Sequence, residues 1–252
     1  MLRVLLLLSA LLMPVVGFLS QRGAFGPDNK TISDAYPTLL IAEGYAFSIW
    51  GVIFLLDIAL AAMQWKRGTA LPPRVQGALV IAFGAASAWM ILFPQLQFWL
   101  ALATIWASLL ALLYAAFHMA DESAGSGSLA TPLAHWAVGL HAGWISLAVL
   151  LNTAQVIAAY RLASIDHQLP WSLGLWAAAA AILAFAIHRV RGHWAYTVAA
   201  IWGLTGVAVK QWSNPMPGAR ESAAIAIALA AVAIGQTLWE RSRQPTPHQT
   251  ST

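Results

Sequence analysis

The sequence has no cysteine, and only 9% of its residues are charged. Without cysteine the chain has no disulfide, no thiolate nucleophile and no cysteine metal site. A soluble domain carries about 25% charged residues, whereas 60% of these 252 residues are hydrophobic. Water is therefore not the main solvent of this protein, and an ordinary soluble enzyme is excluded.

Motifs of conventional catalysis are also missing. The seven histidines form no HExxH pattern or other i, i+4 pair, and we find no glycine-rich phosphate loop or nucleophile elbow. We therefore expect no catalytic residue, no metal site and no required cofactor. The net charge of +4 comes from bases beside hydrophobic segments, which indicates membrane lipid rather than nucleic acid as a partner.

Apolar runs long enough to cross a membrane recur along the chain. A helix of about 17 to 25 apolar residues spans a hydrocarbon layer of roughly 30 Å. We predict an all-α integral membrane protein with about eight transmembrane helices. The expected spans are residues 2–19, 39–64, 77–93, 97–118, 132–159, 171–188, 195–212 and 222–239. The first could be a secretory signal, but no small-x-small cleavage site closes it, so we interpret it as a retained helix.

The distribution of basic residues predicts the orientation. With these spans, eight Lys and Arg residues lie on the side of the termini and five on the other side. The positive-inside rule then places both termini in the cytoplasm. We expect a multi-pass protein of a bacterial cytoplasmic membrane, with a disordered polar tail over residues 241–252.

The predicted helix 39–64 carries acidic and aromatic residues on one face. At about 100° per residue, Phe47, Trp50, Phe54 and Asp57 lie close together on this face. A charged group inside a membrane costs a few kcal/mol and normally faces the bundle or a wet cavity. We expect Asp57 to be protonated, paired or directed into a polar pocket.

The predicted helix 132–159 repeats this pattern. His141, Trp144, Ala148 and Asn152 share one face, which continues to Leu151 and Gln155. These polar groups either orient a ligand or join helices by hydrogen bonds. The spacing of Gly139 and Gly143 predicts the close approach of a neighbouring helix.

Two further groups allow two interpretations each. Lys210 either pairs with Glu43 or extends its ammonium to the membrane surface. The thirteen tryptophans divide by depth into interface anchors and residues within spans. The expected anchors are Trp65, Trp99, Trp171, Trp194, Trp212 and Trp239; the interior residues are Trp50, Trp89, Trp106, Trp144, Trp176 and Trp202.

The segments GWISLAVLLN (143–152), GYAFSIWGVIF (44–54) and SAWMILF (87–93) resemble motifs of the TspO/translocator family of tryptophan-rich sensory proteins. GWISLAVLLN over residues 143–152 is similar to the family motif A-W-x-x-F-A-x-x-L-N, with Leu147 in place of Phe. GYAFSIWGVIF over residues 44–54 resembles W-x-x-G-P-V-W-x-x-L-Y. SAWMILF over residues 87–93 resembles the tryptophan-plus-aromatic end of the third family helix. The chain departs from the family at Glu43 and Ser48, where prolines are usual, and at Asp57, where the family is apolar.

The resemblance implies a five-helix core over residues 1–160, three additional helices over 161–240 and the tail. Family members bind tetrapyrroles, including porphyrin or haem, and other flat hydrophobic molecules between the helices. The lining implied for this chain is Trp50, Phe54, Trp89, Trp144, Ala148 and Asn152, and we add Asp57 and His141 from the helical faces.

Three functions follow as hypotheses. The first is a non-enzymatic sensory protein that binds a flat or sterol-like hydrophobic small molecule in the membrane. The second is a proton-coupled transporter of such a molecule. The third, by resemblance alone, is a membrane enzyme that degrades or rearranges a tetrapyrrole. The sequence leaves the oligomeric state, including a homodimer, open.

Overall fold

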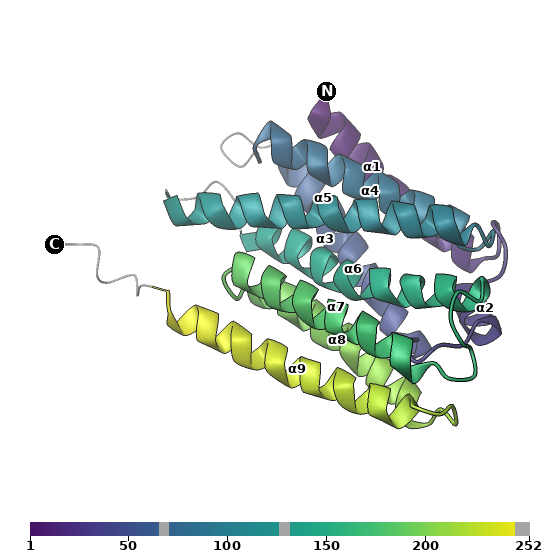
Figure 1. Cartoon of the computed structure of the whole chain (residues 1–252). Helices are drawn as coiled ribbons and strands as arrows, with labels where there is room; N and C mark the ends of the chain where they lie inside the picture. The colour runs from purple at the N-terminus through teal and green to yellow at the C-terminus, as the bar shows by residue number, and fades with distance from the viewer. Residues whose placement is uncertain (66–70, 126–131, 245–252) are drawn as a thin grey trace.

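The computed structural model describes residues 1–65, 71–125 and 132–244, and in these ranges the chain is helical without strands (Figure 1). The disordered tail predicted over residues 241–252 begins too early, because residues 241 and 242 are helical, and its part from position 245 onward lies outside the described residues. The elements are α1 (Leu2–Gln21), α2 (Asn29–Ala35), the 3₁₀ helix η1 (Gly44–Ser48), α3 (Ile49–Met63), α4 (Pro73–Leu92), α5 (Phe98–Gly125), α6 (Pro132–Ala159), α7 (Leu169–Arg189), α8 (Trp194–Trp212) and α9 (Ala219–Ser242).

Seven stretches in the described residues are long and apolar enough to span a membrane. They are α1, η1 with α3, α4, α5, α6, α7 and α9. The predicted eighth crossing is α8, which is not among the seven. Its 19 residues, about 28 Å of helix, still connect the end of α7 to the start of α9 on the opposite side of the bundle (Figure 1). The all-α membrane fold is confirmed.

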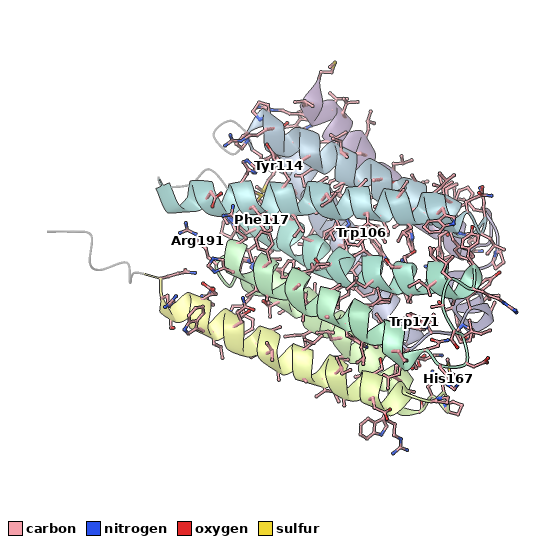
Figure 2. The ribbon with its side chains drawn as sticks, in the orientation of Figure 1. Trp106, Tyr114, Phe117, His167, Trp171 and Arg191 are labelled. Carbon is pink, nitrogen blue, oxygen red and sulfur yellow. The ribbon has the colours of Figure 1, made fainter. Side chains whose placement is uncertain are left out.

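The two ends of the bundle can be identified by their residues. His167 and Trp171 lie at the end where α2 is found, which we call the α2 end, and Arg191 lies at the opposite end (Figure 2). Arginines lie over aromatic rings near both ends, as expected of residues at a membrane interface. These pairs are Arg22 with Phe18 and Arg220 with Trp212 at the α2 end, and Arg189 with Phe117 and Arg243 with Trp239 at the other.

Helix α6 is the centre of the bundle. The buried share of its most apolar window is 78%, against 22–50% for the other candidate spans. It packs so closely on α8 that a Cβ at Gly143 would overlap the carbonyl oxygen of Tyr196. Glycine permits this contact because it has no Cβ. The Tyr196 hydroxyl also donates to Ser146 Oγ at 2.7 Å. The close approach predicted from Gly139 and Gly143 is confirmed, and its partner is α8.

The expected helix 39–64 begins later than predicted, because residues 38–43 are not helical. Their apolar side chains are buried, so the segment resembles a helix in hydropathy alone. Its backbone polar groups are instead satisfied by helices that come late in the chain. Gln168 Oε1 accepts from Leu39 N at 3.2 Å, Gln211 Nε2 donates to Thr38 O at 3.2 Å and to Ile41 O at 3.1 Å, and Ser222 Oγ donates to Leu39 O at 2.5 Å.

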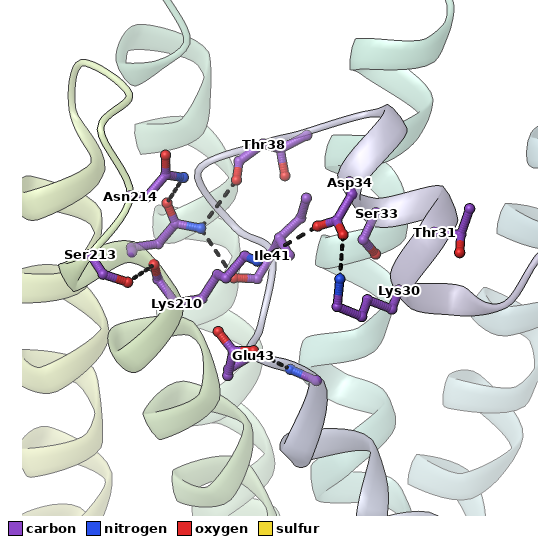
Figure 3. Close-up of polar contacts among 12 residues, drawn as sticks. Lys30, Thr31, Ser33, Asp34, Thr38, Ile41, Glu43, Lys210, Ser213 and Asn214 are labelled. Atoms are coloured by element: carbon purple, nitrogen blue, oxygen red, sulfur yellow. Dashed lines mark hydrogen bonds and ion pairs between the residues drawn. The ribbon is translucent and has the colours of Figure 1, made fainter.

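Helix α2 was not predicted, and it changes the assignment of Lys210. Asp28 caps α2 by accepting from Thr31 N at 2.7 Å. Lys210 Nζ lies 3.7 Å from Asp34 Oδ1, and Lys30 Nζ lies 2.7 Å from Asp34 Oδ2 (Figure 3). The hydrogen bond from Lys30 lowers the pKa of Asp34. The Glu43 carboxylate accepts from Gly44 N. Of the two interpretations of Lys210, the pairing with Glu43 is wrong, because the ion pair that the structure shows is with Asp34.

A pH effect is expected at the start of α8. Burial, and then the charges of His135 and Arg241, lower the pKa of His193 to about 4. The unfolded chain therefore binds a proton that the folded chain does not bind between pH 6.5 and 4, and stability falls as the pH falls through this window. His193→Asn keeps an acceptor for the Ala195 amide, which His193 Nδ1 accepts at 3.3 Å.

We expect the unfolding midpoint in detergent to drop roughly a few °C less for His193→Asn than for the wild type when the pH is lowered from 7 to 5. An equal drop in both proteins would assign the acid sensitivity to other groups.

Candidate ligand-binding site

Aromatic rings from α3 and α4 form a stacked array inside the bundle. The i, i+4 spacing places Trp50 beside Phe54 on α3, and Trp89 beside Phe93 on α4. The centroids are 5.5 Å apart in the first pair and 5.2 Å apart in the second. Trp50 and Trp89 lie 6.4 Å apart with ring planes at 20°, which joins the two pairs. Trp144 of α6 then stands nearly perpendicular to Trp50, at 82°.

These rings form the wall of a cavity of about 450 Å³, its opening included. This space is narrow, and about 20 Å³ of it is open to the centre of a water-sized sphere, close to the room that one water molecule needs. A larger ligand therefore enters only if the side chains that line the cavity move aside. No charged side chain lines the cavity within the described residues, and most of the lining is apolar. The lining residues are Asn29, Ser33, Ile41, Ala42, Phe47, Trp50, Trp89, Phe93, Trp144, Ala148, Leu151, Asn152 and Gln155.

A few polar groups hold the cavity in shape. Asn152 accepts from Trp89 Nε1 at 2.8 Å and donates to the Ala148 carbonyl at 2.9 Å, so its amide fixes the Trp89 ring. Gln155 donates to Ser33 Oγ at 3.2 Å, which ties α2 to α6 over the cavity. Among the residues that the structure describes, the Trp144 Nε1–H has no partner, although the side chain is only 2% exposed. An unpaired buried donor is costly, so it can hold an acceptor atom of a ligand.

A second cavity borders the first on the side of α1. It measures about 1,070 Å³ with its opening, and it shares Asn29, Phe47, Trp50 and Trp89 with the first. Phe54 lines this second cavity together with α1 residues such as Gly17. The Trp50 and Trp89 rings thus separate an open groove between α1, α3 and α4 from the narrower site.

Asp57 and His141 form a buried polar pair next to the aromatic array. His141 Nδ1 lies 2.8 Å from Asp57 Oδ2, and both side chains are fully buried. The His141 ring stacks on Phe83 at 5.7 Å and meets Trp50 edge-on at 5.6 Å. Asp57 Oδ1 and His141 Nε2 have no hydrogen-bond partner within the ranges 1–65, 71–125 and 132–244. The pair lines neither of these cavities, and Trp50 connects it to both.

The eight predicted site residues therefore fall into three places. Five line the first cavity, Phe54 lines the second, and Asp57 pairs with His141 behind Trp50. The prediction did not include Asn29 and Ser33 of α2 or Ile41 and Ala42 of the segment 38–43. Asp28, an N-cap type of residue three positions before Thr31, is the signal that could have indicated α2.

Side-chain exposure divides the tryptophans in parallel with the predicted depth at eight of the twelve sorted positions, while the depth itself stays a prediction. Four expected anchors, Trp65, Trp99, Trp212 and Trp239, are 50–57% exposed, whereas four expected interior residues, Trp50, Trp89, Trp144 and Trp176, are buried. Trp202 differs, because it is 38% exposed although it was expected in the interior, and its indole donates to the Ala46 carbonyl at 2.8 Å. Trp106, Trp171 and Trp194 are half-buried.

Comparison with protein families agrees with this geometry. A family model described as TSPO-like protein matches residues 3–239. The chain belongs to the TSPO-like protein family. The match extends through α7, α8 and most of α9, so the TSPO-like character is not confined to the first five spans. No curated protein and no solved structure matches this TSPO-like chain.

Proposed function

We propose that this TSPO-like membrane protein binds a flat, hydrophobic small molecule, such as a tetrapyrrole or a sterol-like compound, between α3, α4 and α6. The observation that carries the proposal is the cavity bounded by Trp50, Trp89 and Trp144. Aromatic walls favour a planar ligand through stacking. The absence of charge from the lining favours a ligand whose enclosed part is neutral.

The polar groups give this ligand an orientation. The unpaired Trp144 N–H calls for an acceptor, such as a carbonyl or a ring nitrogen. The larger groove beside α1 offers an entrance from the membrane, because its walls include exposed apolar residues such as Phe18. We place the protein in a bacterial cytoplasmic membrane, with both termini in the cytoplasm.

A fluorescence titration tests the proposal. We expect protoporphyrin, and separately haem, to quench tryptophan emission of the purified protein in a saturable manner. Replacing Trp50 and Trp144 with alanine removes two stacking surfaces, so the affinity should fall roughly 10- to 100-fold. The matched control replaces Trp99 and Trp239, which are half exposed and outside the cavity, and should retain the wild-type affinity.

Two outcomes would end the proposal: no saturable quenching by either pigment, or the same affinity in both double variants. Absorption spectra of the bound pigment, followed in light and in darkness, separate binding from tetrapyrrole breakdown. A stable spectrum in both conditions argues against the enzymatic hypothesis.

A proton-coupled transporter is the second candidate, and the Asp57 and His141 pair favours it. Ionisable residues inside a membrane often belong to proton pathways. The pair touches Trp50, which lines the cavity, so a proton on the pair and a ligand in the cavity are one side chain apart.

Flux through vesicles distinguishes the two candidates. In proteoliposomes a transporter should take up protoporphyrin faster when a pH gradient is imposed. Asp57→Asn keeps an oxygen that accepts from His141 but binds no proton, so it should reduce the gradient-driven part of the uptake at least about tenfold while binding continues. If the wild type takes up protoporphyrin at the same rate with and without the pH gradient, the hypothesis of proton coupling is wrong and the proposed binding function is unaffected.

A further inference from the structure

A groove between α8 and α9 opens on the outside of the bundle, away from the aromatic cavity. It measures about 660 Å³ with its open side and shares no lining residue with either aromatic cavity. Leu204, Ala208 and Ala226 are buried and form its floor, while exposed residues form its rims. The full lining is Leu204, Thr205, Ala208, Val209, Trp212, Ala226, Ile227 and Ala230.

The groove covers the depth of one membrane leaflet. Trp212 ends α8 and Arg220 is in the first turn of α9, so both lie at the α2 end. A helix rises 1.5 Å per residue, which places Leu204 about 12 Å below Trp212 and Ala230 about 15 Å below Arg220. Half of a hydrocarbon layer is roughly 15 Å. The groove thus runs from the membrane surface to the middle of the bilayer, which is the course of an acyl chain.

Arg220 is at the surface end of this groove. Its guanidinium lies 5.8 Å from the ring centroid of Trp212, which is a rim residue of the groove. Arg220 is exposed, and no ion pair involving it is found in the part of the chain that the structure describes. A guanidinium presents several donors in a planar fork that fits the oxygens of a phosphate.

We propose that the groove between α8 and α9 is a binding site for an anionic phospholipid. One acyl chain lies along the floor, and the phosphate binds to Arg220 beside Trp212. A lipid with net negative charge is favoured because the ammonium of a zwitterionic headgroup offsets the attraction to the arginine. Glu221 follows Arg220 in sequence but lies about 100° around the helix from it. The site is independent of the proposed ligand function.

The experiment compares phosphatidylglycerol with phosphatidylcholine that carries the same acyl chains. Native mass spectrometry of the full chain, exchanged into each lipid in detergent, reports how much lipid stays bound. We expect about fivefold stronger retention of phosphatidylglycerol. Arg220→Gln should remove this preference. Arg243→Gln is the matched control, because Arg243 stacks on Trp239 at the other end of α9 and Trp239 does not line the groove.

A second variant tests the groove itself. Ala230→Leu fills the inner end and should lower the retention of both lipids while the preference for phosphatidylglycerol persists. The proposal is overturned if Arg220→Gln leaves the preference intact, or if Arg243→Gln removes it equally. It is also overturned if Ala230→Leu leaves lipid retention unchanged. A shift from dimer to monomer with unchanged lipid would show that a second copy occupies the groove instead.

Discussion

Replacing Asp57 with alanine is expected to cost about 1–3 kcal/mol of the free energy of unfolding, because it leaves His141 buried without its hydrogen-bond partner. His141 Nε2 already lacks a hydrogen bond in the described part of the chain, so after the substitution neither ring nitrogen would be paired there, in a site closed by Phe83 and Trp50. Titration with sodium dodecyl sulfate in mixed micelles, followed by circular dichroism, gives the free energy of unfolding.

The controls separate the pair from its individual members. Asp57→Asn keeps an acceptor for His141 and should cost much less than Asp57→Ala. Replacing both residues with apolar side chains, Asp57→Leu with His141→Phe, should restore most of the loss, because two unpaired polar groups are removed together. A loss below about 1 kcal/mol for Asp57→Ala would mean that the unfolded chain in the micelle pairs His141 equally well.

The second large effect is expected at Gly143, where alanine should destabilise the protein by about 1–3 kcal/mol or more. The new methyl group would overlap the Tyr196 carbonyl oxygen, which is backbone and cannot rotate away. Helices α6 and α8 would have to separate, which weakens the hydrogen bond from Tyr196 to Ser146 and displaces Trp144. Stability and pigment affinity should fall together.

Gly84→Ala is the matched control on α4. No described atom lies within 4 Å of a Cβ built at Gly84. Alanine in a helix interior is more favourable than glycine by roughly 0.5–1 kcal/mol, so this variant should be equal to or slightly more stable than the wild type. If Gly143→Ala and Gly84→Ala lose the same free energy of unfolding, the close approach of α6 and α8 is not the cause of the loss at Gly143.

Helix positions were predictable from sequence because the membrane imposes a strong rule of length and apolarity. The predicted helix 132–159 has the bounds of α6, and most others differ by a few residues at each end. The start at residue 39 was wrong for a specific reason. The hydropathy of Leu39, Leu40 and Ile41 is the same in a buried loop as in a helix, and the backbone partners lie far away in sequence.

In the candidate site, too, the arrangement of residues on one helix was predictable from the sequence, whereas contacts between helices were not. Helical periodicity was sufficient to place Trp144, Ala148 and Asn152 on one wall, since these three are neighbours on α6. The contact of Asp57 with His141 joins positions 84 residues apart, so each was selected separately while their pairing was not. Which residues face one another across helices depends on packing that one sequence does not reveal.

The division into a core over residues 1–160 and an addition over 161–240 stays a prediction. Hydrogen bonds cross the proposed boundary at the segment 38–43, where Gln168, Gln211 and Ser222 satisfy its backbone. Ile41 and Ala42 of this segment line the aromatic cavity. The last three helices therefore support a wall of the candidate site without lining the cavity themselves.

This support for the cavity wall forms late in the synthesis of the chain. Ser222 follows Leu39 by 183 residues, and a ribosome adds about 5–20 residues per second. The segment 38–43 must therefore wait roughly 10–40 s for its final hydrogen bond. Before α9 is inserted, the Leu39 carbonyl lacks its hydrogen bond from Ser222, so the cavity wall formed by Ile41 and Ala42 lacks part of its support and the proposed ligand binding would be deferred.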